Sequence, residues 1–205
     1  VVGYLPNLPQ TIVAMLAAAS IGAIWCSCSP DFGTTGVVDR FGQIEPKVLF
    51  IADGYYYHGK EFTSVDKLPH ILEHIPSIEK VVVIPYINAP LPSRENMFIW
   101  DEIIDKSTAT QIDFASLDFN HPLYILFSSG TTGIPKCIVH RAGSVLLQHL
   151  KEHQLHCDLK PGDRLFYFTT CGWMMWNWLV SGLASGATLV LYDGSPTYPT
   201  ITALF

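Results

Sequence analysis

Hydrophobic residues near the start of the chain follow two different spacings. Ile12, Met15, Leu16 and Ala19 recur at the spacing of one helix face. Pro9 suits a first helical position, and a glycine at position 22 suits the residue after a helix end, so this pattern predicts a helix of about fourteen residues. Residues 23–27 are short and apolar and precede a Ser-Pro-Asp turn, which indicates a strand.

The same cycle of helix and buried strand repeats along the chain. A second helical face made by Val37, Phe41 and Ile44 ends at Pro46, and residues 64–75 read as a helix that kinks or restarts at Pro69. Runs of the buried-strand type are predicted at 48–52 and 81–84. Residues 85–121 are rich in proline and polar positions, and they predict a surface connection with a short helix near 100–104.

Regular spacing returns after this connection. The pattern predicts strands at 123–127, 137–139, 165–168 and 187–192, and helices at 143–157 and 173–183. Strands that alternate with helices indicate an α/β fold with mainly parallel sheets flanked by helices.

Composition narrows the class of protein. The net charge of -6 leaves no basic stripe for a run of phosphates, so no nucleic-acid partner is expected. Five cysteines, without a C-x-x-C pair, argue against a disulfide framework and a zinc ribbon and favour a reducing, cytosolic setting. The chain begins at Val1 and its last residues, 198–205, carry no helix-ending signal, which predicts a fragment of a larger protein.

The apolar run at residues 11–28 raises the question of a membrane span. A span needs roughly 20 continuous apolar residues, whereas Ser20, Gly22 and Ser27 interrupt this run. No basic leader precedes it, as a signal peptide requires. A buried helix followed by a buried strand is therefore the interpretation, and no membrane span is predicted.

The most informative stretch is 125–136, with the sequence ILFSSGTTGIPK. Glycines let the backbone N–H groups approach a ligand, hydroxyl side chains add donors and a lysine adds positive charge, which together suit phosphate. These residues are Ser128, Ser129, Gly130, Thr131, Thr132, Gly133 and Lys136. The stretch matches neither G-x-x-x-x-G-K-[ST] nor G-x-G-x-x-G, so the common ATPase and dinucleotide loops are disfavoured. A polar hairpin turn without a ligand is the structural alternative.

Residues 125–136 also resemble the signature of the adenylate-forming superfamily, which includes acyl-CoA synthetases, luciferases and peptide-synthetase adenylation domains. Segments 4–7, 14–17, 20–23 and 135–140 look like the large domain of short-chain acyl-CoA synthetases. Segments 27–33, 171–178, 185–188 and 192–196 are most similar to the acetoacetate-activating branch of that group. The resemblance implies that residues 1–205 are part of an N-terminal AMP-binding domain, with the small C-terminal domain absent.

The activity that this resemblance implies is that of a ligase with two half-reactions. Acetoacetate attacks the α-phosphorus of ATP, and CoA then displaces AMP from the acyl-adenylate, with Mg²⁺ as cofactor. Lys136, Thr131 and Thr132 would be catalytic, and the loop from Ser128 would hold the phosphates. An isolated fragment is expected to be inactive. The alternatives are an acetyl- or propionyl-CoA synthetase, a truncated product that only binds nucleotide, and an α/β binding module whose loop is a turn.

Four further groups admit two interpretations each. By resemblance, Trp173, Met174 and Met175 would line the acid pocket, while their spacing equally fits a core helix. His149, His153, His156 and Cys157 could approach a metal, but the pattern is not H-E-x-x-H, so an exposed helix face is predicted and no metal site. His140 either lines the nucleotide pocket or is a core or loop residue, and residues 55–57, three tyrosines, predict packing at a strand end rather than base stacking.

Overall fold

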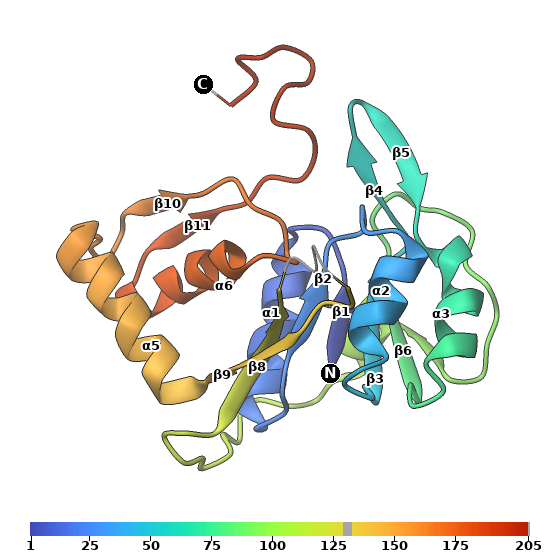
Figure 1. Cartoon of the computed structure of the whole chain (residues 1–205), viewed down its shortest axis with the longest axis horizontal. Helices are drawn as coiled ribbons and strands as arrows, with labels where there is room; N and C mark the ends of the chain where they lie inside the picture. Colours follow the sequence, from blue (N-terminus) through green and yellow to red (C-terminus); the bar gives the residue numbers. More distant parts are fainter. Residues whose placement is uncertain (129–132, 205) are drawn as a thin grey trace.

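The computed structural model describes residues 1–128 and 133–204. Its centre is a parallel five-stranded sheet with the strand order β2-β1-β3-β6-β7 (Figure 1). These strands are β1 (Val2–Tyr4), β2 (Cys26–Cys28), β3 (Val48–Ala52), β6 (Lys80–Ile84) and β7 (Met97–Ile99). The predicted α/β class with mainly parallel strands is confirmed.

Helices cover both faces of this sheet because its strands carry apolar side chains on both sides. On one face, α2 (Thr34–Phe41) and α3 (Leu68–His74) pack on side chains of β1, β3 and β6. On the other face lie α1 (Pro9–Ser20) and Trp100 of α4 (Trp100–Lys106). Alternation along a strand decides the face: Tyr4 belongs to the first core and Leu5 to the second.

Two antiparallel hairpins stand beside the sheet. One pairs β4 (Gly54–Tyr57) with β5 (Lys60–Thr63), and the other pairs β8 (Pro122–Phe127) with β9 (Cys137–Arg141). The strands predicted at 123–127 and 137–139 are thus confirmed, each extended by one or two residues. The hairpin β4–β5 was not predicted, because its tyrosine run carries no alternation of apolar and polar positions.

The rest of the chain forms a second layer on the side of α1. Its helices are α5 (Ala142–Lys151) and α6 (Met174–Ser181), followed respectively by the π-helical turn η2 (Glu152–His156) and the 3-10 turn η3 (Gly182–Ser185). The short strands β10 (Arg164–Phe166) and β11 (Thr188–Val190) pair in parallel. Trp176 and Val180 of α6 enter the core beside α1, so the two layers share one core.

Several predicted boundaries are corrected. The first helix has twelve residues rather than fourteen. Pro69 marks a restart, since the 3-10 turn η1 (Val65–Lys67) precedes α3. The helix predicted at 143–157 changes to a π-helical turn after Lys151, and the connection at 85–121 contains strand β7. The strand predicted at 23–27 lies at Cys26–Cys28, with Trp25 as a separate bridge to Tyr124.

Candidate functional site

The order of the strands places a candidate site at one edge of the sheet. The crossover through α1 takes the chain from β1 to β2, and the crossover through α2 brings it back to β3 on the other side of β1. In open parallel sheets, ligands bind beyond the carboxyl ends of the strands where such crossovers diverge. The residues that follow β1, β2 and β3 are therefore the first candidates.

A cavity of about 270 Å³ lies at this edge. It is lined by residues that follow β1 and β2, by the tyrosines of β4, and by segments before α6 and after β11: Pro6, Asn7, Ser29, Pro30, Asp31, Tyr55, Tyr56, Tyr57, Phe168, Thr169, Thr170, Tyr192, Asp193, Gly194 and Pro196. Asn7 is buried and accepts a hydrogen bond from Trp176 Nε1 at 2.9 Å, which fixes α6 to the end of β1. Positions far apart in the sequence thus converge on one cavity.

The acidic side chains of the cavity disfavour a phosphate group there. Asp31 and Asp193 both line it, and no lysine or arginine is among its described lining residues. Burial raises the pKa of the Asp193 carboxyl above its ordinary value, and its Oδ2 atom has no hydrogen-bond partner among the described residues. A polyanion would meet two carboxylates here, so the cavity suits an uncharged or hydrogen-bonding part of a ligand.

The loop that the sequence singled out begins at the same edge. Trp25 N donates to Leu123 O at 3.0 Å and Ile125 N donates to Trp25 O at 2.9 Å, which attaches β8 in parallel to the segment leading into β2. Parallel strands end at the same edge of a sheet. Ser128, which follows β8, therefore lies at the same edge as Ser29, which follows β2. Figure 1 shows the start of this loop beside β2.

Two hydrogen bonds close the base of the loop. Ser128 N donates to Lys136 O at 3.0 Å, and Lys136 N donates to Ser128 Oγ at 2.9 Å. The Lys136 side chain is exposed, so its ammonium group is accessible to an anion. Gly133 has φ 148°, a backbone conformation that side chains disfavour, and no atom of the described residues lies within 4 Å of where a Cβ would stand. The predicted site residues Ser129, Gly130, Thr131 and Thr132 lie outside the described residues.

Helix α2 and the turn after it hold both strands that lead into the loop. Gln43 Nε2 donates to Pro135 O at 2.8 Å, and Cys137 Sγ lies 3.7 Å from Gln43 Oε1. The Arg40 guanidinium stacks on Phe32 at 4.7 Å from the ring centroid and lies 5.9 Å from that of Phe127. Neither Arg40 nor Gln43 was predicted from the sequence, because nothing local marks them as neighbours of the loop.

The proposed acid-pocket residues lie at the start of α6. Trp173 is 58% exposed and Met174 is 45% exposed, while Met175 is half-buried. None of the three lines the cavity at the edge of the sheet. The buried part of the helix begins at Trp176, so the core-helix interpretation applies to the residues after Met175.

The prediction of an exposed histidine face on α5 is wrong. His149 and His153 are buried, and they lie against α6. Ser181 Oγ donates to Trp178 O at 2.7 Å and is hydrogen-bonded to His149 Nδ1 at 2.9 Å and to His153 Nε2 at 3.0 Å. Both imidazoles thus lie at the contact of two helices, while His156 and Cys157 are exposed.

Two other groups are placed by aromatic contacts. His140 is half-buried on β9 and packs on Tyr124, with ring centroids 5.0 Å apart. Tyr55 stacks on Phe62 of the neighbouring strand β5, with centroids 5.3 Å apart. The predicted packing thus applies to Tyr55, whereas Tyr56 and Tyr57 are 37% and 44% exposed, and all three tyrosines line the cavity.

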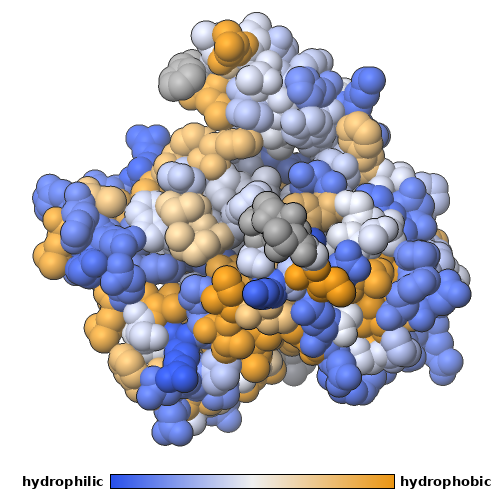
Figure 2. Space-filling model, viewed as in Figure 1, coloured by the Kyte–Doolittle hydropathy of each residue, from blue (hydrophilic) through white to orange (hydrophobic). Residues whose placement is uncertain are grey.

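The exposed surface and the cysteines add two facts. All five cysteines are described and carry free thiols. Among the described helices, none is both long enough and apolar enough to cross a bilayer. On the face seen in Figure 2, hydrophobic surface gathers near the centre, where the same view in Figure 1 shows the hairpin β8–β9.

Comparison with known proteins identifies a family and several relatives. Residues 1–205 match the family model described as AMP-binding enzyme. The chain is 56% identical over 208 residues to acetoacetyl-coenzyme A synthetase of Rhizobium meliloti (strain 1021), covering 100% of this chain and 32% of that protein. It is 50% identical over 206 residues to malonamoyl-CoA synthetase vrtB of Penicillium aethiopicum, covering 97% of this chain and 28% of that protein.

A solved structure supports the fold directly. Acetoacetyl-CoA synthetase from Streptomyces lividans superimposes with a TM-score of 0.93 and 48% identity, covering 99% of this chain and 31% of that chain. The chain thus spans about a third of the length of the relatives it matches.

Proposed function

Since this chain belongs to the AMP-binding enzyme family, we propose that it holds the phosphates of ATP in a ligase that activates acetoacetate and transfers it to CoA. One observation carries the proposal. The glycine- and hydroxyl-rich segment 125–136 starts at the carboxyl edge of the parallel sheet, and its base is closed by Ser128 and Lys136. In this proposal residues 1–205 are part of the N-terminal AMP-binding domain, and the small C-terminal domain is not among them.

The proposed reaction has an electrostatic obstacle in its first half. A carboxylate must approach the α-phosphorus of a polyanion, and two unit charges about 4 Å apart repel by roughly 4 kcal/mol at an effective dielectric of 20. The exposed ammonium group of Lys136 lowers this repulsion by balancing charge on the β- and γ-phosphates. In the proposal Thr131, Thr132 and the backbone N–H groups of Ser129, Gly130 and Gly133 hold the same phosphates.

Mg²⁺, when bound, supplies further charge neutralisation on the phosphates. The described base of the loop offers one hydroxyl, that of Ser128, and this oxygen already accepts the Lys136 N–H. Such a donor set fits Mg²⁺ held mainly by phosphate oxygens and water rather than by a protein cage.

The proposed acid substrate, acetoacetate, rests on sequence similarity and not on a contact in the structure. Relatives named for acetoacetyl-CoA and for malonamoyl-CoA lie at 56% and 50% identity, so overall identity does not separate these acids. The start of α6 is the proposed place of discrimination, with Trp173, Met174 and Met175 near the acid. The free thiols fit a reducing compartment, and we place the protein in the cytosol.

The experiment separates the two half-reactions. Residues 1–205 replace the matching third of the Rhizobium meliloti enzyme, and acetoacetate-dependent exchange of pyrophosphate into ATP reports the first half. Thioester formation from added acetoacetyl-adenylate reports the second. Lys136→Ala and Gly130→Val are expected to slow the exchange by about a hundredfold and thioester formation by far less.

Lys106→Ala, at an exposed position of α4, is the matched control and should leave both rates unchanged. Equal loss in both half-reactions for Lys136→Ala would contradict the assignment of the loop to the triphosphate. Exchange with malonamate instead of acetoacetate would overturn the choice of acid alone.

A further inference from the structure

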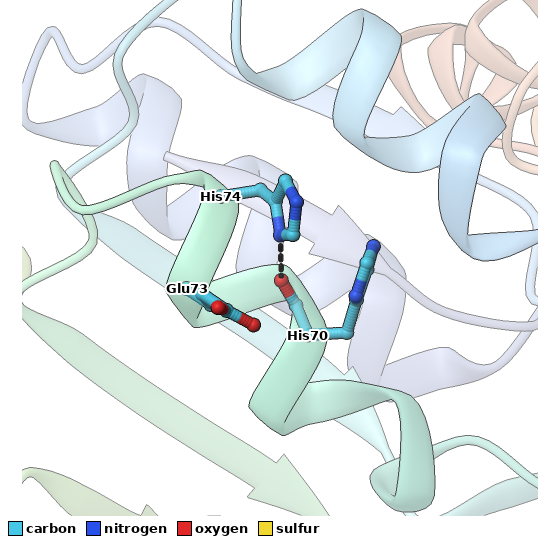
Figure 3. A group of neighbouring side chains, drawn as sticks. All are labelled: His70, Glu73 and His74. Carbon is cyan, nitrogen blue, oxygen red and sulfur yellow. Dashed lines mark hydrogen bonds between the residues drawn. The ribbon is translucent and has the colours of Figure 1, made fainter.

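Three side chains with metal-binding atoms gather on the outer face of α3. Leu68 and Ile71 of this helix are buried in the core under the sheet, which turns the opposite face to solvent. That face carries His70, Glu73 and His74, all exposed (Figure 3). The spacing i, i+3 and i+4 places side chains on neighbouring turns of one helix face, so the fold itself brings the three together.

The distances between these side chains suit binding of one shared metal ion. One ligand atom from each residue lies within 4.8 Å of the others, and the two imidazole rings have centroids 4.0 Å apart. Exposed side chains change rotamer at little cost, so small rotations bring these atoms to the separation that one metal ion requires. Two imidazoles and one carboxylate form a donor set that late transition metals prefer over Mg²⁺ or Ca²⁺.

A hydrogen bond prepares His74 for this role. Its Nδ1 lies 3.0 Å from the carbonyl oxygen of His70, as the dashed line in Figure 3 shows. A carbonyl oxygen only accepts, so Nδ1 carries the proton and Nε2 of the neutral ring has the free lone pair. Metal-binding histidines commonly have this arrangement, in which the distal N–H donates to a carbonyl and fixes the ring and its tautomer.

We propose that His70, Glu73 and His74 form a surface site for a divalent late transition metal ion. The two imidazoles bind the ion, the Glu73 carboxylate provides the third ligand, and water fills the remaining positions. The affinity should follow Cu²⁺ above Ni²⁺ and Zn²⁺, because the site imposes little geometry of its own. This site is separate from the phosphate loop, and the proposal does not depend on the proposed ligase activity.

Titration of the untagged chain with NiCl₂ in a calorimeter tests the proposal. The exposed Cys137 and Cys157 are first changed to serine, because thiolates compete for soft metals. One ion is expected to bind per chain. His70→Ala and His74→Ala should each weaken binding by about tenfold or more, and Glu73→Gln by about threefold.

His156→Ala is the matched control, because this histidine is exposed at the end of η2 and lies outside the cluster. It should leave the affinity unchanged. If His156→Ala weakens binding as much as His74→Ala, or if neither His70→Ala nor His74→Ala weakens it, the proposal is overturned. Circular dichroism in EDTA verifies that each variant is folded.

A second measurement needs no substitution at the site. Long-range ¹H–¹⁵N spectra of the imidazoles show which ring nitrogen carries a proton. Added Zn²⁺ should shift the Nε2 resonance of His74 while Nδ1 keeps its proton. Loss of the Nδ1 proton, or shifts confined to histidines outside α3, would overturn the assignment.

Discussion

The side-chain amide of Gln43, in the turn after α2, contacts Pro135 near the far end of the proposed phosphate loop. Its Nε2 donates to Asp39 O at 2.6 Å and to Pro135 O at 2.8 Å. Gln43→Ala removes both bonds, each worth about 1 kcal/mol. If the loop binds the triphosphate, ATP affinity should fall by about fivefold in a fluorescence titration of the chain, and the melting temperature should fall by several degrees because both bonds also stabilise the fold.

Two variants delimit this prediction. Gln43→Glu keeps an oxygen near Cys137 but loses the donor to Pro135 O, so it should weaken ATP binding at least as much as alanine does. Gln111→Ala, at an exposed position of the long connection, should have no effect. A normal ATP affinity for Gln43→Ala would show that the position of Pro135 does not matter for nucleotide binding.

Sequence alone could predict residues whose chemistry is local. The segment 125–136 can be recognised as a candidate from the sequence because glycine, hydroxyl and lysine residues lie within one short stretch. Gln43 and Asn7 were not predictable, because their partners Pro135 and Trp176 lie 92 and 169 positions away. His149 and His153 were misjudged for the same reason, since Ser181, their hydrogen-bond partner, belongs to another helix.

At the scale of elements, β1 has room for only a glycine at its middle position. A Cβ on Gly3 would lie 2.7 Å from the buried ring of Trp25. Gly3→Ala should therefore destabilise the fold by about 1–3 kcal/mol, through overpacking of a ring that cannot move away. Urea unfolding followed by circular dichroism measures the loss.

Gly36 of α2 provides the opposite case. Its nearest neighbour is the end of the Arg40 side chain at 3.5 Å from the position of a Cβ. Gly36→Ala should stabilise the protein by about 0.5–1 kcal/mol, because alanine favours the helix. An unchanged or higher urea midpoint for Gly3→Ala would contradict the packing argument, and a lower one for Gly36→Ala would contradict the helix argument.

The packing of α5 and η2 against α6 should weaken in acid. Burial lowers the pKa of His149 and of His153 below the ordinary value, which His regains when the chain unfolds. When the pH falls below about 6.5, the ordinary pKa of histidine in the unfolded chain, the unfolded chain binds protons before the folded one does. The free energy of unfolding therefore decreases until the pH reaches the lower pKa of the folded state. Each unit by which folding lowers a histidine pKa reduces the free energy of unfolding by about 1.4 kcal/mol at the acid end.

The variant His153→Gln isolates this effect, because it keeps a donor for Trp178 O without a titratable ring. Its urea midpoint should change less between pH 7.5 and about pH 5.5 than that of the parent chain. His70→Gln, at an exposed position, serves as the control. A parent chain that is equally stable at both pH values would contradict the prediction.

The elements themselves were predicted to different extents. The buried runs at 48–52 and 81–84 became β3 and β6, because parallel strands covered on both faces are continuously apolar. The hairpin β4–β5 escaped prediction, since its stability comes from contacts across strands, such as Tyr55 on Phe62, rather than from its pattern. Strand β7 was missed because it has three residues within a proline-rich connection.

At the scale of the whole molecule, strand β9 is an open edge. It pairs with β8 on one side, and no other described strand pairs with it. Ile138 is 47% and Val139 54% exposed. An apolar edge strand can pair with another chain, so we expect the chain to self-associate as its concentration rises.

Val139→Lys places a charge on this edge and should shift self-association to about tenfold higher concentration in sedimentation velocity. Ile21→Lys, at a position 67% exposed in the turn after α1, is the control for a general gain in charge. An equal shift for both variants would exclude β9 as the surface of contact.

The attachment of β8 to the sheet through Trp25 has a spectroscopic consequence. The Trp25 indole is 1% exposed and lies between Gly3 of β1 and Phe50 of β3, while its backbone bonds to Leu123 and Ile125. If the hairpin detaches, water reaches this indole, and its fluorescence emission moves to longer wavelength. In a variant that keeps Trp25 and carries phenylalanine at the other four tryptophan positions, the emission wavelength would report in real time whether the hairpin β8–β9 is attached to the sheet.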